Sequence, residues 1–492
     1  MSILLKINEI DNVALAIGSI ESGDEIELNG EKISVLSDIP KAHKAAIKYI
    51  KKGENIIKYG YPIGHATADI KKGEHVHTHN LKTNLNEVLE YEYKPVDSSY
   101  QVKTDRTFWG YKRENGKAGI RNEIWIIPTV GCINGIAKTI ENMSKDMDSV
   151  DGVYAFTHPY GCSQLGDDLK NTQKLLAGLV RHPNAAGVLV LGLGCENNLI
   201  KDFRQVVGEE NAKRVKYLEC QSVEDEIETA LGMVEELAEY AKLSKREEIP
   251  ISELIVGLKC GGSDGYSGIT ANPMVGAFSD MLVKQGGTTI LTEVPEMFGA
   301  ETLLMERCPT RELYEETVEM INDFKEYYIS HNQVVYENPS PGNKDGGITT
   351  LEEKSLGCTT KSGTMAVNGV YEYGQEIDKK GLMLLSAPGN DLVATTALIA
   401  SGAQMVLFTT GRGTPFGGAA PTVKISTNNE LFNKKRRWID FNAGDIANGK
   451  SIDETAEDLF EYVIKLASGE IKTQNEKHGI RDISIFKDGV FL

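Results

Sequence analysis

Three histidines lie at alternate positions in the segment HVHTHN: His75, His77 and His79. On a strand, alternate side chains point to the same side, so these imidazoles would share one face. Imidazole is the commonest metal ligand among protein side chains. We therefore expect His75 and His77 to bind a metal ion, although an exposed polar strand face would show the same pattern. His65 can join them across a hairpin, whereas nothing near His43 distinguishes it from a surface histidine.

Five of the seven cysteines follow apolar, strand-like segments, and a sixth, Cys358, lies in a long irregular stretch. In open α/β sheets, ligands bind outside the carboxyl ends of the strands. We expect these thiols to share one sheet edge, where they either pack as small apolar side chains or line one cleft as iron ligands or polar walls. No C-x-x-C spacing supports a zinc knuckle or a ferredoxin-type cluster. The five are Cys132, Cys162, Cys195, Cys220 and Cys260.

Polar side chains accompany these cysteines and can bind a polyhydroxy carboxylate. Such a ligand needs donors for its carboxylate and paired donors and acceptors for its hydroxyls, and helix N-termini after strands also favour anions. Asp167 has a simpler interpretation as a helix cap or first-turn charge. Arg412 can clamp a carboxylate with two parallel hydrogen bonds. The predicted substrate-binding residues are Asn134, Gln164, Asp167, Asn197, Asp264, Asn390 and Arg412.

Candidates for acid–base chemistry also follow strand-like segments. His158 precedes Pro159 at a predicted strand end. Glu293 and Glu296 form a carboxylate pair, which can hold a divalent cation or act as base and acid. Solvated loop carboxylates would give the same pattern.

The N-terminal part of the chain predicts a small all-β domain at residues 1–95. Short strands such as Val13–Ala16 and Glu25–Leu28 alternate with turns, and two KKGE tetrads predict turns that lead into strands. Residues 96–107 lack periodicity and are expected to be a linker.

The rest of the chain predicts two α/β regions with mainly parallel sheets, so the fold class is multidomain α/β. Apolar runs alternate with helical stretches, which is typical of this architecture. We place one domain at 108–245 and another at 250–492. The irregular stretch at 336–360 exceeds normal loop lengths and is therefore suspected to be functional.

Composition and missing motifs exclude several functions. The 492 residues carry 53 basic and 71 acidic side chains, a net charge of −18, so no nucleic-acid partner is expected. No apolar run approaches the ~20 residues of a membrane span. Lys6 and Glu9 interrupt the N-terminal segment, so we expect no signal peptide. GLGCEN lacks the third glycine of a dinucleotide site, and no GxxxxGK[ST] motif is present.

Long motifs are spread over nearly the whole chain: HVHTHN, IPTVGCINGIA, YGCSQLGDD, GLGCENN, CGGSDGYSGITANP, LTEVPEMFGAE, YENPSPGNKDGGITTLEEKSLGC, LLSAPGNDLVATTAL and FTTGRGTPFGG. In combination they resemble the altronate/galactarate dehydratase family of sugar-acid hydro-lyases. The resemblance implies an N-terminal SAF-type β-domain fused to a two-part α/β catalytic region. It also implies iron(II)-stimulated dehydration of D-altronate to 2-dehydro-3-deoxy-D-gluconate in hexuronate catabolism.

Our mechanistic hypothesis combines this resemblance with the residues above. A divalent metal, Fe2+ or alternatively Mn2+, binds the substrate carboxylate, and Arg412 holds that carboxylate. The base is His158, Glu293 or Lys361, and the sequence does not choose among them. The predicted metal ligands are His75, His77, Cys132, Cys162, Glu196 and Glu296.

Other interpretations stay open at this point. The substrate can be galactarate or another sugar acid, and the cysteines can hold an iron–sulfur cluster. A thiol-nucleophile transferase and a non-catalytic carbohydrate-binding protein are further alternatives. Seven thinly spread cysteines suit a reducing cytoplasm, and we expect a small sugar acid as the partner, no membrane, and a possible homo-oligomer.

Overall fold

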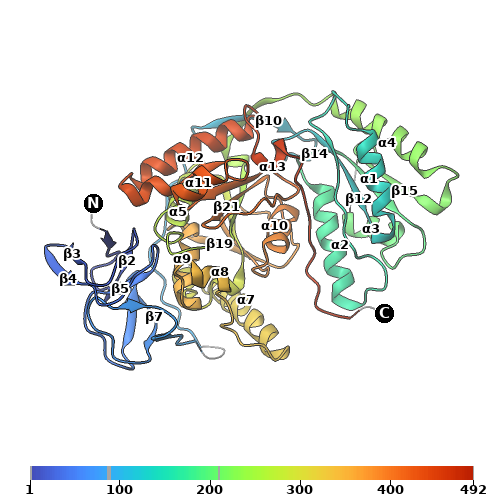
Figure 1. Cartoon of the computed structure of the whole chain (residues 1–492). Helices are drawn as coiled ribbons and strands as arrows, with labels where there is room; N and C mark the ends of the chain where they lie inside the picture. The colour runs from blue at the N-terminus through green and yellow to red at the C-terminus, as the bar shows by residue number, and fades with distance from the viewer. Residues whose placement is uncertain (1–2, 86–89, 209–210, 491–492) are drawn as a thin grey trace.

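The computed structural model describes residues 3–85, 90–208 and 211–490. Residues 3–85 form a separate β region at one end of the molecule (Figure 1). It contains a four-stranded sheet of order β1-β2-β5-β8, a β3–β4 hairpin and a three-stranded sheet β6-β7-β9. The strands are β1 (Leu4–Leu5), β2 (Val13–Ala16), β3 (Glu25–Leu28), β4 (Glu31–Ser34), β5 (Lys44–Ala46), β6 (Asn55–Lys58), β7 (Tyr61–Ala66), β8 (His75–Val76) and β9 (Leu81–Lys82).

The two KKGE tetrads form the same turn, as predicted. In each, the glutamate carboxylate accepts a hydrogen bond of 2.9 Å from the backbone N–H of the first lysine, Lys51 or Lys71. β6 follows the first turn and β8 follows the second.

The segment after the β region is extended and lies against the C-terminal part of the chain. Residues 90–106 form neither helix nor strand. The backbone N–H of Val96 donates to the carbonyl of Glu306 at 2.8 Å, and that of Lys103 donates to Lys284 at 2.9 Å. This connection is therefore fixed along its length by backbone hydrogen bonds.

A four-stranded parallel sheet follows, in the order β13-β12-β14-β15. In β12, Ile124 and Ile126 belong to one buried cluster while Trp125 and Ile127 belong to another, so both faces are covered. The strands are β12 (Glu123–Pro128), β13 (Val153–Ala155), β14 (Ala185–Gly192) and β15 (Val215–Glu219), and the helices are α1 (Asn134–Met143), α2 (Gly166–Arg181), α3 (Ile200–Val207) and α4 (Glu226–Ala241).

A three-stranded sheet joins the two ends of this unit. The central strand β10 pairs antiparallel with β11 and with β16. The interval that we left between the two predicted α/β domains, residues 246–249, thus contains most of a strand, β16. These strands are β10 (Thr107–Lys112), β11 (Ala118–Gly119) and β16 (Glu247–Pro250).

The last unit is built on a seven-stranded parallel sheet of order β19-β20-β18-β17-β21-β22-β23. The chain first adds strands on one side of β17 and later on the other, so the topological switch point lies between β17 and β21. Ligand sites in open α/β sheets form at such points. The strands are β17 (Ile255–Cys260), β18 (Thr288–Leu291), β19 (Val367–Tyr371), β20 (Gly381–Leu385), β21 (Met405–Thr410), β22 (Thr422–Ser426) and β23 (Phe441–Asn442).

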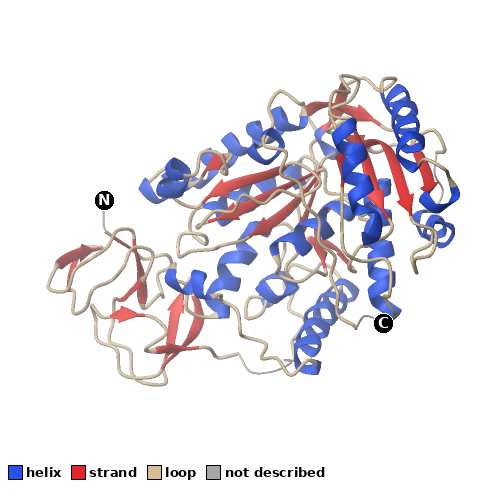
Figure 2. Cartoon of the chain, turned by 45° about the vertical axis from the view of Figure 1, so that its right-hand side comes forward, coloured by secondary structure: helices blue, strands red, loops and turns tan. Residues whose placement is uncertain are grey.

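Helices cover both faces of the large sheet (Figure 2). α2 of the smaller unit packs on α10, and a Cβ at Gly178 of α2 would lie 2.2 Å from the carbonyl oxygen of Ala400 in α10, so these helices touch backbone to backbone. The helices are α5 (Ala271–Lys284), α6 (Thr302–Met305), α7 (Arg311–Ser330), α8 (Pro341–Asp345), α9 (Leu351–Thr359), α10 (Asp391–Ala400), α11 (Asn429–Lys434), α12 (Ile452–Ala467) and α13 (Gln474–Lys477). Within the described residues, no helix combines the length and apolar character needed to cross a membrane.

The stretch 336–360 differs from the predicted irregular loop because it contains α8 and α9. Every residue of α9 is buried. The Thr350 side chain caps this helix by accepting from the backbone N–H of Glu353. Because α9 is covered all round, its sequence has no amphipathic period to reveal it. Cys358 therefore lies on a buried helix and not in a loop.

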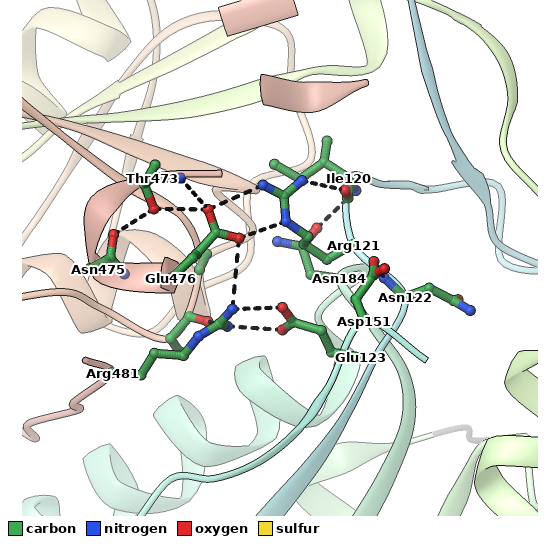
Figure 3. Close-up of polar contacts among 12 residues, drawn as sticks. Ile120, Arg121, Asn122, Glu123, Asp151, Asn184, Thr473, Asn475, Glu476 and Arg481 are labelled. Carbon is green, nitrogen blue, oxygen red and sulfur yellow. Dashed lines mark hydrogen bonds and ion pairs between the residues drawn. The ribbon is translucent and has the colours of Figure 1, made fainter. Parts of the chain in front are cut away.

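Buried ion pairs join the start of the smaller parallel sheet to the C-terminal segment of the chain (Figure 3). Arg121, just before β12, donates to the Glu476 carboxylate of α13 at 2.7 Å. Arg481 donates to Glu123 of β12 at 2.8 Å. Both pairs are almost completely buried, so they hold the start of the smaller sheet on the C-terminal segment.

Candidate active site and metal centre

The predicted ligands His75 and His77 lie beside a third imidazole, that of His43. β5 and β8 pair antiparallel with Lys44 opposite Val76, so His43 stands across from His77. Nδ1 of His43 lies 3.0 Å from Nε2 of His75, and the rings of His43 and His77 have centroids 4.7 Å apart. Each of these three histidines offers a nitrogen, and the nitrogens lie within 4.8 Å of one another. We call His43, His75 and His77 the histidine cluster.

Burial keeps the histidine cluster uncharged. It lowers the pKa of His43, and it lowers the pKa of His75 to about 3 and that of His77 to about 4, with nearby positive charge adding to the effect. Nδ1 of His77 is buried without a hydrogen-bond partner among the described residues. A neutral imidazole with a free lone pair is the form that binds a metal ion. The donor set therefore fits the divalent iron or manganese expected from the sequence.

A second group of buried polar side chains forms where β17 and β18 end. Lys259 and Cys260 are the last residues of β17. Nζ of Lys259 donates to Glu293, and the backbone N–H of Cys260 donates to the other Glu293 oxygen at 3.0 Å. Glu293 has a left-handed backbone with φ of 68°, which costs a residue with a side chain roughly 1–2 kcal/mol. Backbone strain of this kind is typical of functional sites.

Lys361, in the 3-10 turn Thr360–Ser362 after α9, adds a second cation. Its Nζ lies 2.9 Å from Sγ of Cys260 and 3.5 Å from a carboxylate oxygen of Glu293. Burial alone would lower the pKa of Lys361, but its electrostatic interactions with Cys260, Cys358 and Glu293 outweigh burial and raise that pKa. Lys361 is therefore held as a cation.

The group Cys260, Glu296 and Cys358 also brings three ligand-type atoms within 4.8 Å. Oε2 of Glu296 lies 3.1 Å from Sγ of Cys358, and the two sulfur atoms are 3.2 Å apart. However, Nζ of Lys354 lies 2.8 Å from the other Glu296 oxygen, and Lys361 lies beside Cys260. These buried cations oppose a divalent ion. Of the two groups, the histidine cluster is thus the better metal site.

We call Lys259, Cys260, Glu293 and Lys361 the candidate catalytic group, or catalytic group for short. Glu353 links the β region that carries the histidine cluster to α9, the helix that also carries Cys358. Its two carboxylate oxygens each lie 2.8 Å from a buried lysine of the β region, Lys44 or Lys58. Burial alone would raise the pKa of Glu353, but these lysines lower it. His43 is oriented by the same interface, because its Nε2 lies 3.3 Å from the Asp345 carbonyl oxygen.

A cavity of about 400 Å³ is lined by Ala42, Asp264 and Arg412, among others. Ala42 directly precedes His43 of the histidine cluster. A second hollow, of about 10 Å³, has Asp264, Glu353 and Cys358 among its lining residues. Asp264 lines both spaces, so the two lie next to each other. A larger cavity of about 1000 Å³ lies elsewhere, around Arg113 and Arg214, away from these side chains.

Three family models match the chain in succession. They describe an altronate/galactarate dehydratase SAF domain at residues 2–84, a D-galactarate dehydratase/altronate hydrolase second domain at 110–242, and a D-galactarate/altronate dehydratase C-terminal domain at 251–491. The chain is 54% identical over 498 residues to an altronate dehydratase of Bacillus subtilis, with 100% of both chains covered. The chain belongs to the altronate/galactarate dehydratase family.

Two further relatives also match this chain over nearly its whole length. An altronate dehydratase of Escherichia coli is 51% identical over 493 residues, with 99% of each chain covered. A galactarate dehydratase (L-threo-forming) of Escherichia coli is 33% identical over 516 residues, covering 97% of this chain and 95% of the relative. The resemblance noted in the sequence is thus confirmed, as is the fold of an N-terminal SAF domain followed by α/β regions.

In this member of the dehydratase family, the residues predicted in the C-terminal unit lie around one sheet edge. Glu293 and Lys361 touch, and Glu296 lies within 3.3 Å of Cys260. Asp264 is buried and accepts hydrogen bonds from Thr427, Ser267 and Asn428, while exposed Arg412 lines the same cavity. The Asn390 side chain instead caps α10 by accepting from Leu392 and Val393.

The residues predicted in the smaller unit lie at a different sheet edge, so the dehydratase does not unite all predicted ligands in one site. Glu196 accepts from Thr129 Oγ1 and from backbone N–H groups of its own loop, and Asn197 accepts from the N–H of Ser163. These contacts fasten loops together. Among the described residues, two groups bring three ligand-type atoms within 4.8 Å of one another, and neither group includes a residue of the smaller unit. The members of this set are Cys132, Asn134, Cys162, Gln164, Asp167, Glu196 and Asn197.

The expectation that five cysteines share one sheet edge was therefore wrong. Four of them follow the strands of the four-stranded sheet, while Cys260 ends β17 of the seven-stranded sheet. Both sheets repeat the same β-then-α pattern, so spacing along the chain could not separate them.

His158 is not a free acid–base group in this dehydratase. Its Nε2 lies 2.8 Å from the carbonyl oxygen of Pro128, and its Nδ1 accepts from the N–H of Tyr160 at 3.2 Å. Burial lowers its pKa to about 4. Both ring nitrogens of His158 are hydrogen-bonded to backbone atoms, so this side chain holds the loops of the smaller unit in place.

Sequence reasoning missed His43, Lys259 and Glu353. His43 precedes a strand of only three residues, and its partner lies more than thirty residues later. His65, the alternative that we considered, instead hydrogen-bonds Asn84 at 2.8 Å. His79 is exposed beside His75, with ring centroids 5.4 Å apart. An antiparallel pairing of β5 with β8 was the signal that would have identified His43.

Proposed function

We propose that this chain dehydrates D-altronate to 2-dehydro-3-deoxy-D-gluconate. The observation that carries the proposal is the identity of 54% and 51% with altronate dehydratases over essentially the whole chain, compared with 33% for galactarate dehydratase. The buried catalytic group at the ends of β17 and β18, next to the switch point of the large sheet, supports an acid–base reaction.

The reaction removes the proton alpha to the substrate carboxylate and expels the neighbouring hydroxyl. We assign Glu293 as the base, because His158 is committed to backbone and Lys361 is held as a cation. Burial is the main cause that raises the pKa of Glu293, opposed by Lys259 and Lys361. A carboxylate with a raised pKa is a stronger base than an ordinary one.

Lys361 is assigned to protonate the departing hydroxyl, since its ammonium group lies beside Glu293 and Cys260. Transfer of the abstracted proton within this group then returns Glu293 and Lys361 to their starting states. Lys259 keeps the Glu293 carboxylate in place between turnovers.

The histidine cluster is proposed to hold Fe2+, or alternatively Mn2+. When bound, the ion supplies positive charge that stabilises a carboxylate as its enediolate develops. Arg412 is proposed to bind the substrate carboxylate from the cavity wall, and Asp264 to accept hydrogen bonds from substrate hydroxyls. A cavity of about 400 Å³ lies within the usual size range of small-molecule sites.

The test is an anaerobic screen of six-carbon aldonates and aldarates with iron(II) or manganese(II), following the 2-keto acid formed. Altronate should give the highest kcat/KM, and the Glu293→Gln variant should lower its turnover by orders of magnitude. Preference for galactarate would overturn the substrate assignment and keep the reaction class. Absence of a keto acid from every substrate would overturn both.

We also propose that the enzyme works in the cytoplasm. All seven cysteines are free, although two sulfur atoms lie only 3.2 Å apart. Free thiols so close together fit a reducing compartment.

A further inference from the structure

We propose that Cys132, Cys162 and Cys195 together hold an iron–sulfur cluster at the carboxyl edge of the four-stranded sheet. All three thiols are exposed, whereas cysteine is among the most buried residue types. They lie in the loops that follow β12, β13 and β14. These strands are neighbours in the sheet, with β12 in the centre, so their loops are neighbours too. The proposal does not depend on the proposed function.

Backbone hydrogen bonds fix the three loops against one another. The N–H of Gly131 donates to the carbonyl of Tyr160 at 2.8 Å, and the N–H of Asn198 donates to that of Gly161 at 2.9 Å. The loop of Cys162 is thus bonded both to the loop of Cys132 and to the loop of Cys195. The three cysteines therefore lie on loops that are held to one another.

A glycine before each cysteine permits this close approach. A Cβ at Gly161 would lie 1.9 Å from the carbonyl oxygen of Thr129, and φ at this residue is 99°. Gly194, before Cys195, also has a positive φ of 124°. The backbone at Gly161 and Gly194 therefore requires glycine. The loop conformations in turn fix the backbone positions of Cys162 and Cys195.

The spacing favours a cluster over a single ion. An ion with tetrahedral bonds of about 2.3 Å needs sulfur atoms about 3.8 Å apart. In the described chain, the groups whose ligand atoms lie within 4.8 Å do not include these three thiols. Adjacent strands lie about 4.8 Å apart, so loops after three neighbouring strands span a wider gap. Several irons bridged by sulfide fill such a gap, and cysteine thiolates are their usual protein ligands.

The electrostatic setting favours thiolates and an anionic cluster. α1, α2 and α3 begin within five residues after Cys132, Cys162 and Cys195, respectively. Parallel βα units place all three helix N-termini at this edge, where their partial positive charge stabilises anions. Gln164, two residues after Cys162, is 2% exposed, and its Nε2 has no hydrogen-bond partner among the described residues.

Cys220, the fourth cysteine at this edge, is excluded as a ligand. It is buried, and burial raises its pKa to about 11. A four-iron cluster held by only three thiolates has one iron open to water or to an oxygen ligand. The site is thus suited to an oxygen-rich small molecule.

The test is reconstitution of the full chain with iron(III) chloride, sulfide and excess thiol under anaerobic conditions, where the thiol reduces part of the iron to iron(II). Iron and acid-labile sulfide per chain are measured, together with the visible charge-transfer absorption of the cluster. The wild-type chain should retain several irons and sulfides after desalting. Cys132→Ser, Cys162→Ser and Cys195→Ser should each lose most of them, whereas the matched control Cys220→Ala should not.

Two results would overturn the proposal: a desalted wild type without labile sulfide, or serine variants that keep as much sulfide as wild type. Iron bound without sulfide also contradicts it, because that result indicates a mononuclear site. Circular dichroism checks that each variant is folded. His77→Ala should keep the labile sulfide, which separates this site from the histidine cluster and from the altronate assay.

Discussion

Lys44 and Glu353 lie 2.8 Å apart, although 309 residues separate them in the chain. Lys44 directly follows His43 of the histidine cluster, and Glu353 lies on α9, which also carries Lys354 and Cys358. Their contact is almost completely buried. It joins the part of the protein suited to bind a metal to the part suited for acid–base chemistry.

Replacing Glu353 should therefore destabilise the whole interface. Glu353→Gln leaves two buried ammonium groups, those of Lys44 and Lys58, without a carboxylate, and breaking such a buried pair costs about 3–5 kcal/mol. Urea unfolding measures the loss. The matched control is Glu352→Gln on the same helix, because Glu352 bonds Thr83 and no lysine. Equal losses in both variants would contradict the assigned role of the ion pairs.

Removing one imidazole of the histidine cluster should weaken metal binding. We expect His77→Ala to lower affinity for Mn2+ or Fe2+ by at least 10–100-fold, since each neutral imidazole supplies one bond to the ion. Anaerobic titration calorimetry without sulfide measures this change. His65→Ala is the control, because His65 lies in the same β region but bonds Asn84. Unchanged affinity in His77→Ala would place the ion elsewhere.

Glu293→Gln should lower kcat by about 10²–10⁴-fold, the usual contribution of a general base. Lys361→Met should also lower kcat, because it removes the proposed proton donor and the cation beside Cys260. Steady-state kinetics with altronate give both values. Glu301→Gln is a matched control: Glu301 is a buried glutamate paired with a lysine, Lys325, outside the catalytic group.

Glu301→Gln should lower stability and leave kcat close to wild type. If it reduced kcat as much as Glu293→Gln does, the kinetic loss would reflect damage to the fold. The assignment of Glu293 as base would then fail.

The pair of Arg121 and Glu476 predicts a defined loss of stability in acid. Burial alone would raise the pKa of Glu476 from its usual 4.5, but Arg121 and Arg481 lower it to about 2. A lowered carboxyl pKa contributes stability that is complete above about pH 4.5 and is lost as pH falls through about 2. The Glu476→Gln variant should be less stable than wild type at neutral pH. It should also lose less stability than wild type as the pH falls from about 4.5 to about 2.

Urea unfolding at a series of pH values measures both effects. Exposed Glu457 on α12 provides the control, since Glu457→Gln should leave the pH dependence unchanged. A slope in Glu476→Gln equal to that of wild type would show that other carboxylates control the acid loss.

Much of the fold followed from the sequence because local patterns determined it. The strands Val13–Ala16 and Glu25–Leu28 are found at their predicted positions. Both α/β regions were recognisable because buried parallel strands form continuous apolar runs. α9 was missed for the opposite reason: a helix buried on every side shows no period.

The candidate site was only partly predictable because it depends on pairing between distant segments. Glu293, Glu296 and Lys361 were selected from their types and positions, and the fold brings them together. His43 joins the histidine cluster only through the register of β5 with β8. The division of the cysteines between two sheets likewise depends on strand order, which spacing along the chain does not encode.

The left-handed backbone at residue 293 has a consequence for how this position tolerates change. Glycine would relieve the strain there, but it would remove the carboxylate that lies beside both Lys259 and Lys361 and leave Lys259 with Asp391 as its remaining acidic partner. Aspartate would keep the charge on a shorter side chain and retain the strain. No substitution at position 293 is therefore expected to be without effect. A survey of random variants should find this position among those that tolerate the fewest residue types.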